Sequence, residues 1–109
     1  MISVHMATQH FFFRLIPPRG SFAEDMTEAE RALMSEHAEY LRGYFEQGVV
    51  LAYGPVFDPA GLYGMGIFAV DDEAEAERIA QGDPTIRAGL HTYSLSPMYL
   101  TGSRAGNSE

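Results

Sequence analysis

The chain has 109 residues, a formal charge of −8 at neutral pH, seven arginines, and neither lysine nor cysteine. The lack of cysteine excludes disulfides, thiolate catalysis and thiolate metal ligands, and the lack of lysine excludes Schiff-base and P-loop lysine chemistry. The net negative charge repels phosphate backbones, so nucleic acid is not an expected partner.

No stretch approaches the roughly 20 apolar residues of a membrane-spanning helix, and residues 1–10 lack the basic and apolar segments of a signal peptide. We therefore expect a cytoplasmic protein with no membrane partner. The length fits one domain, which we place at residues 9–100. A flexible leader is expected over residues 1–8 and a flexible tail over residues 101–109.

The first predicted element is a strand over residues 11–16, where the sequence FFFRLI is rich in aromatic and β-branched side chains. Two prolines at 17–18 end it. Residues 19–25 are expected to form a loop. Phe12 and Arg14 share one face of this strand, because side chains alternate between the two faces of a sheet.

A long helix is predicted to begin after Thr27, which has capping-box spacing with Glu30, and to run to about Gln47. Gly48 is a suitable residue to end it. Apolar and aromatic residues recur at steps of three and four along it, which indicates one buried face. That stripe comprises Leu33, His37, Tyr40, Leu41, Tyr44 and Phe45.

Two further strands are predicted at residues 49–53 and 62–70, the first bounded by Gly54-Pro55. Between them, residues 58–61 read DPAG, a turn sequence in which Pro presets φ and Gly permits a positive φ.

The second half of the chain ends in a helix, a short helical turn and a strand. Asp71 or Asp72 caps a helix over residues 73–80, and Pro84 starts a helical turn that reaches Arg87. A strand follows over residues 91–95, with Ser96-Pro97 after it.

The element order is therefore β-α-β-β-α-β, which predicts an α+β fold of the ferredoxin-like type with an antiparallel four-stranded sheet. Both helices must cover one face of the sheet, which leaves the other face apolar and uncovered. Such a face exceeds the usual exposed patch of a monomer. We expect a homodimer that packs two of these sheet faces together, with a small-molecule pocket between or beside the sheets.

The four histidines show none of the spacings of common metal motifs, and no metal site is expected. His5, His10 and His91 are expected to be structural or solvent-exposed. His37 differs because it lies on the apolar stripe of the long helix, where partial desolvation favours the neutral imidazole. It is a candidate general base if a carboxylate orients its other nitrogen, or else a core histidine bonded to backbone or water.

Asp83 is the candidate carboxylate, and its alternative role is to cap the helical turn that starts at Pro84. The two roles are compatible, because one oxygen can cap while the other accepts from histidine. Arg14 can bind an anionic substrate or pair with a surface glutamate. Tyr53, Gly54 and Pro55 complete the predicted substrate-binding set, in which Arg14 or a backbone amide near Gly54 stabilises a developing oxyanion.

Four short segments in this order resemble the YCII-related family. They are residues 36–41 (EHAEYL), 48–55 (GVVLAYGP), Asp83-Pro84 followed by 88–90 (AGL), and 96–98 (SPM). The resemblance implies a dimeric α/β barrel built from ferredoxin-like subunits. It also implies a candidate active site in which a helix histidine, here His37, pairs with the aspartate of the Asp-Pro motif, here Asp83.

Two hypotheses of function follow. In the first, the protein is a cofactor-free acid/base enzyme of lyase, dehalogenase or isomerase type, in which His37 moves a proton on a small organic substrate and Asp83 orients it. In the second, it is a non-catalytic dimer that binds a small ligand or has a structural role. Metal binding by His37, Asp83 and Glu36 is a poor third reading, because side chains 36 and 37 point about 100° apart on a helix.

Overall fold

The computed structural model describes residues 7–104, and the order of elements agrees with the one predicted, apart from one short helix within the loop expected over residues 19–25. The leader expected over residues 1–8 and the tail expected over 101–109 fall largely outside the described residues. The elements are β1 (Gln9–Ile16), α1 (Phe22–Asp25), α2 (Glu28–Glu46), β2 (Val50–Val56), β3 (Tyr63–Val70), α3 (Glu73–Gln81), α4 (Pro84–Arg87) and β4 (Thr92–Met98).

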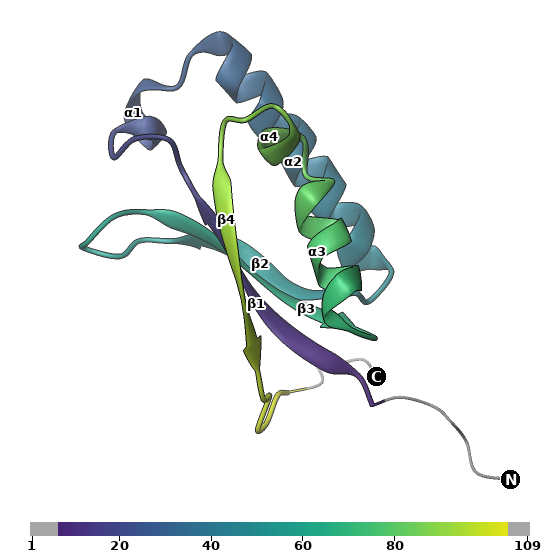
Figure 1. The fold of residues 1–109 in the computed structure, drawn as a ribbon. Coiled ribbons are helices and arrows are strands. Elements are labelled where there is room, and N and C mark those ends of the chain that lie inside the picture. The colour runs from purple at the N-terminus through teal and green to yellow at the C-terminus, as the bar shows by residue number, and fades with distance from the viewer. Residues whose placement is uncertain (1–6, 105–109) are drawn as a thin grey trace, which may run out of the picture.

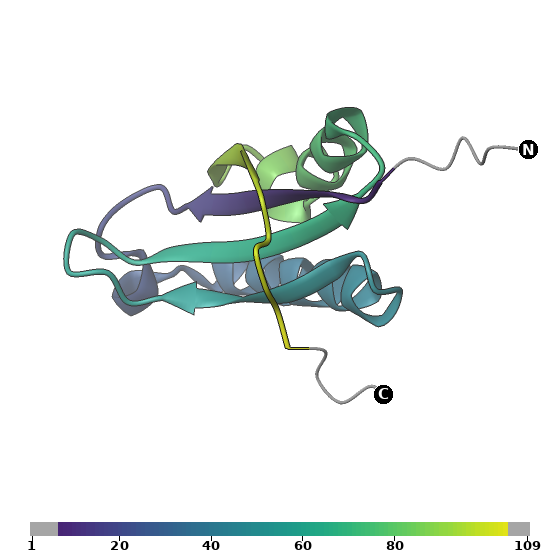
Figure 2. The same ribbon diagram turned by 90° about the horizontal axis from the view of Figure 1, so that it is seen from below.

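The four strands form one antiparallel sheet in the order β2-β3-β1-β4, which confirms the predicted ferredoxin-like fold. Figure 1 shows the helices gathered on one side of this sheet, and Figure 2 shows β1, β3 and β2 lying side by side. The helix α2 packs over β2 and α4, whereas α3 packs over β1, β3 and β4.

The core lies between the sheet and the two long helices. Phe13 of β1 and Phe68 of β3 stack at its centre, with ring centroids 5.0 Å apart. Gly66 faces both rings, and a Cβ there would lie 3.4 Å from each, so the glycine leaves room for the stack. The buried apolar residues are Phe11, Phe13, Leu15, Leu41, Val50, Phe68, Val70, Ala76, Ile79 and Ala80.

The predicted capping of α2 is confirmed at both ends. The Glu30 amide donates to Thr27 Oγ1 at 3.1 Å, and the Thr27 amide donates to Glu30 Oε1 at 2.9 Å. Gly48 follows the helix with φ 81°, a conformation that glycine adopts without steric cost. Local sequence signals therefore position the helix that carries His37.

Residues 19–25 are not simply a loop, because Phe22–Asp25 forms the short helix α1. Arg19 anchors this segment, donating from Nη2 to Glu30 Oε1 at 2.7 Å and from Nε to Asp25 Oδ1 at 2.8 Å. The hydrogen bond from Arg19, followed by the one from the Thr27 amide, lowers the pKa of Glu30 to about 2. Burial of Phe22, a tertiary contact, holds the turn against the domain.

Two predicted strand ends were wrong. β2 continues through Gly54-Pro55 to Val56, and β4 continues through Ser96-Pro97 to Met98. Both are edge strands of the sheet. A proline without an amide hydrogen is tolerated there, because its nitrogen can lie on the side that has no neighbouring strand.

The sheet face opposite the helices is uncovered in the described residues (Figure 1). Phe12 and Ile67 are paired at its centre and both remain partly exposed. The expected homodimer through this face stays a prediction. Within residues 7–104, none of the helices combines the length and the apolar character that a membrane crossing needs.

Candidate active site

His37 and Asp83, 46 residues apart in sequence, are brought into direct contact. His37 Nδ1 lies 2.6 Å from Asp83 Oδ2. The histidine projects from the middle of α2, and the aspartate stands at the N-cap of α4. Packing of α2 against α4 is what joins the two side chains.

Asp83 is fully buried, and both of its carboxylate oxygens are hydrogen-bonded. Oδ1 accepts from the Thr85 amide at 2.9 Å and from Thr85 Oγ1 at 2.8 Å, while Oδ2 faces His37. The capping role and the histidine-pairing role therefore coexist on one carboxylate.

These contacts decide which of the two side chains holds the proton between them. Burial alone would raise the pKa of Asp83, but the hydrogen bonds from His37 and Thr85 outweigh it and hold the pKa below its ordinary value. An ionised carboxylate only accepts hydrogen bonds, so the proton between the two groups belongs to His37 Nδ1. When the imidazole is uncharged, its Nε2 carries the free lone pair.

Gly82, the residue before Asp83, is the C-cap of α3. A Cβ at Gly82 would collide with the Tyr40 hydroxyl, which donates to the Ile79 carbonyl at 2.8 Å. The close approach of α2 to this position therefore requires glycine.

We expect Gly82→Ala to destabilise the protein by about 1–2 kcal/mol, because the added methyl group displaces Tyr40 from its bond to Ile79. Gly43→Ala is the matched control, since nothing lies within 4 Å of a Cβ in that helical position. It should be neutral or stabilising by up to about 1 kcal/mol. Urea denaturation of both variants measures the difference, and equal stabilities would contradict the steric argument.

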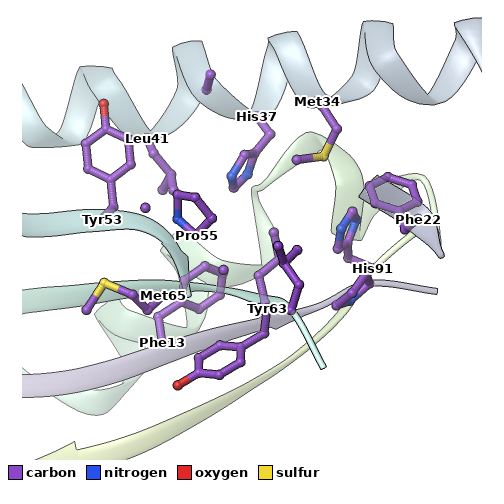
Figure 3. Close-up of a pocket in the computed structure, with 16 residues that line it drawn as sticks. Phe13, Phe22, Met34, His37, Leu41, Tyr53, Pro55, Tyr63, Met65 and His91 are labelled. Atoms are coloured by element: carbon purple, nitrogen blue, oxygen red, sulfur yellow. The ribbon is translucent and has the colours of Figure 1, made fainter. Parts of the chain in front are cut away.

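His37 lines a cavity of about 290 Å³ between α2 and the sheet, and its side chain is 15% exposed (Figure 3). Among residues 7–104, no arginine, aspartate or glutamate lines this cavity. Its walls are mainly apolar and aromatic and include Phe13, Leu15, Pro17, Phe22, Met34, Ala38, Leu41, Leu62, Tyr63 and Met65. The volume and character suit a small and largely apolar ligand.

Three of the four predicted substrate-binding residues reach this cavity. Tyr53, Gly54 and Pro55 form the wall that β2 contributes. Figure 3 shows the hydroxyl groups of Tyr53 and Tyr63 directed away from His37, so these residues present rings or backbone to the cavity rather than phenol oxygens.

Arg14 does not reach the His37 cavity. It lies on the opposite sheet face from Phe13 and Leu15, its guanidinium stacks over the Tyr63 ring at 3.9 Å, and it lines a second cavity. Strand alternation, which the sequence already implied, separates Arg14 from the helix side of the sheet. It therefore cannot stabilise an oxyanion beside His37.

His91 and Phe22 were missed as site residues by sequence reasoning. The structure places His91 in the wall of the His37 cavity, with 5% of its surface exposed. Its ring meets Phe22 edge-on, with centroids 5.1 Å apart. The sequence placed His91 in the strand predicted over residues 91–95, whereas β4 begins at Thr92 and His91 lies between α4 and β4. Strand alternation therefore gave no signal for its place at the cavity.

Within the part of the chain that the structure describes, no three histidine, aspartate or glutamate side chains are grouped so as to hold a metal ion. Glu36, which the metal reading would require, is exposed on α2.

Fold and site together define a small ferredoxin-like α+β domain in which a partly exposed histidine, paired with a buried aspartate, adjoins an apolar cavity. The model of the YCII-related domain matches residues 11–99, and the chain belongs to the YCII-related family. This match confirms the family resemblance of the sequence. No curated protein is significantly similar to the chain.

Proposed function

We propose that this protein is a cofactor-free acid/base enzyme acting on a small organic substrate, with His37 as the proton-transferring group and Asp83 as its positioning partner. The observation that carries the proposal is the 2.6 Å contact between His37 Nδ1 and the buried Asp83 carboxylate, at the wall of a cavity. The His–Asp pair supplies the acid/base group from side chains alone.

In this mechanism His37 Nε2 takes a proton from a carbon or oxygen of the substrate. The electron pair of the broken bond then forms a new double bond or expels a leaving group. Asp83 holds the Nδ1 proton and stabilises the imidazolium ion that forms. The proton on Nε2 returns to another substrate atom or to the leaving group, as lyase, dehalogenase and isomerase reactions require.

The lining of the cavity also supports a small organic substrate. The described residues put no arginine or carboxylate in its lining, so they offer no fixed charge to bind a strongly charged group. Tyr53, Gly54 and Pro55 are the proposed substrate-binding residues of the β2 wall. A cytoplasmic location stays a prediction.

Proton abstraction can be tested without the natural substrate. A panel of small cyclic ketones and lactones in D₂O is followed by ¹H NMR for loss of the acidic α-proton. We expect the protein to accelerate exchange of at least one compound, and His37→Gln to lower that rate at least about 100-fold, because the general base is lost. Asp83→Asn should also lower it, since an amide cannot stabilise the imidazolium ion.

The matched control is His10→Gln, because His10 lies on β1 and does not line the His37 cavity. It should retain the exchange rate. Exchange no faster than in buffer for the whole panel, or an unchanged rate in a folded His37→Gln variant, would reject the enzymatic proposal in favour of a non-catalytic ligand-binding module.

The uncovered sheet face supports a homodimer as the working assembly. We expect the protein to sediment as a dimer, and Ile67→Glu to shift it to monomer, because a buried unpaired carboxylate at the centre of the interface is costly. Sedimentation velocity measures both. Ala32→Glu, on the exposed surface of α2, is the control and should remain dimeric. A monomeric wild-type protein would contradict the assembly.

A further inference from the structure

Thr85 binds the oxygen of Asp83 that does not face His37. Its side-chain hydroxyl donates to Asp83 Oδ1 at 2.8 Å, and its backbone amide donates to the same atom at 2.9 Å. Thr85 and Asp83 are both fully buried, so solvent does not share in these bonds. Hydrogen bonds therefore connect three side chains in series, from Thr85 through Asp83 to His37.

The hydroxyl bond is not needed to cap a helix. Within the described residues, Asp72 caps α3 through one bond, from the Glu75 amide at 2.9 Å. Asp83 already has the equivalent bond from the Thr85 amide, which caps α4. The hydroxyl is thus an additional donor to the carboxylate, and its effect falls on the carboxylate and on the histidine bonded to it.

We propose that Thr85 is a positioning residue of the His37–Asp83 pair, whose hydroxyl holds Oδ2 of the carboxylate toward His37 and keeps the shared proton on His37 Nδ1. The catalytic consequence rests on the proposed function, whereas the location of the proton does not.

The role matters most after His37 Nε2 has taken a proton from the substrate. The pair then holds two protons, and Asp83 competes with Nδ1 for the second one. Burial raises the pKa of Asp83, but the hydrogen bonds from His37 and Thr85 outweigh it. Without the Thr85 hydroxyl, the buried carboxylate is a stronger base and draws the proton away from Nδ1. A protonated Asp83 cannot stabilise the imidazolium ion, and the neutral ring that remains is a weak acid for returning the proton.

The ¹⁵N shifts of the His37 ring test where the proton lies, because protonated and unprotonated ring nitrogens differ widely in shift. Thr85→Val removes the hydroxyl and keeps the shape, whereas Thr85→Ser keeps the hydroxyl and loses a methyl group. Each protein is acidified until the Nε2 shift shows protonation. We expect Nδ1 of Thr85→Val to move toward the unprotonated shift, and Nδ1 of Thr85→Ser to stay at the wild-type shift.

Thr85→Val is expected to fold, because backbone hydrogen bonds hold residue 85 without its side chain. The amide is bonded to Asp83, and the carbonyl accepts from the Leu90 amide at 2.9 Å and from the His91 amide at 3.2 Å. Thr85→Ala is a second variant without the hydroxyl and should show the same change at Nδ1. Thr92→Val, exposed on β4, is the matched control and should retain the wild-type shift.

The catalytic consequence is measured with the proton-exchange reaction. We expect kcat to fall about tenfold in Thr85→Val and to be retained in Thr85→Ser, since one hydrogen bond to a charged group is lost. KM should not change, because Thr85 is outside the described lining of the cavity.

A wild-type Nδ1 shift in folded Thr85→Val or Thr85→Ala, or the same change in Thr85→Ser, would overturn the proposal. Exchange that requires His37 but has equal kcat in Thr85→Val and wild type would retain the enzyme and overturn the positioning role. An Nδ1 change confined to the variants without the hydroxyl, with no exchange by the wild type, would retain the role of Thr85 in the pair and reject the enzymatic proposal.

Discussion

Asp83→Ala is expected to destabilise the protein by about 3 kcal/mol, the largest effect of any single substitution at the site. The change removes three hydrogen bonds, from the Thr85 amide, the Thr85 hydroxyl and His37. It also leaves the Thr85 groups buried without an acceptor, which adds their desolvation penalty. Urea denaturation, with the midpoint and slope fitted together, measures the loss.

Asp72→Ala is the matched control for this prediction. Asp72 caps α3 as Asp83 caps α4, accepting from the Glu75 amide at 2.9 Å, but it is exposed and has no histidine partner. Its loss should cost about 1 kcal/mol, the usual value of an N-cap. If Asp83→Ala costs no more than Asp72→Ala, the buried carboxylate acts only as a cap, and its contact with His37 adds nothing to stability.

Stability should also depend on pH through His91. The unfolded-state pKa of histidine is about 6.5, whereas the folded-state pKa of His91 is about 4 because burial disfavours the charged ring. Between these values the unfolded chain binds a proton that the folded chain does not. The contribution of His91 is thus fully present above pH 6.5 and is lost as the pH falls toward 4, by about 3 kcal/mol in total.

The measurement is the free energy of unfolding of wild type and His91→Phe between pH 5 and 7.5. The wild type should lose stability on acidification more steeply than the variant. Asp83 should not contribute to the loss of stability in this pH window, because its lowered pKa places its titration below that of an ordinary aspartate. His10→Phe, on β1, should retain the wild-type slope. Parallel slopes for wild type and His91→Phe would contradict a depressed pKa at His91.

The order and type of the main elements were predictable from sequence because they depend on local signals. Thr27 and Glu30 form the capping box that their spacing indicates, and Gly48 ends α2 with a positive φ. The alternation along β1 likewise placed Phe12 and Arg14 on one face, and the burial pattern agrees. In each case the interacting groups lie within a few residues of one another.

The candidate site was predictable only in part. The apolar stripe of α2 singled out His37, but no periodicity connects it with Asp83, and the pairing was implied by family resemblance. The contact of the two side chains at 2.6 Å depends on the packing of α2 against α4. Phe22 lay in a predicted loop and His91 at the start of the strand predicted over residues 91–95, so their meeting at the cavity was not indicated by sequence.

The amino-acid sequence by itself determined the β-α-β-β-α-β order, the ends of α2, the faces of β1 and the place of His37 on the apolar stripe of α2, because neighbouring residues set each of these. In the structure Leu41 of that stripe is buried, whereas Phe45 at its end is exposed. Only the tertiary structure decided that β2 and β4 continue through their prolines, that Arg14 lies away from the His37 cavity, and that His91 enters it. The physical reason is that edge position, burial and cavity walls arise from contacts between segments distant in the chain.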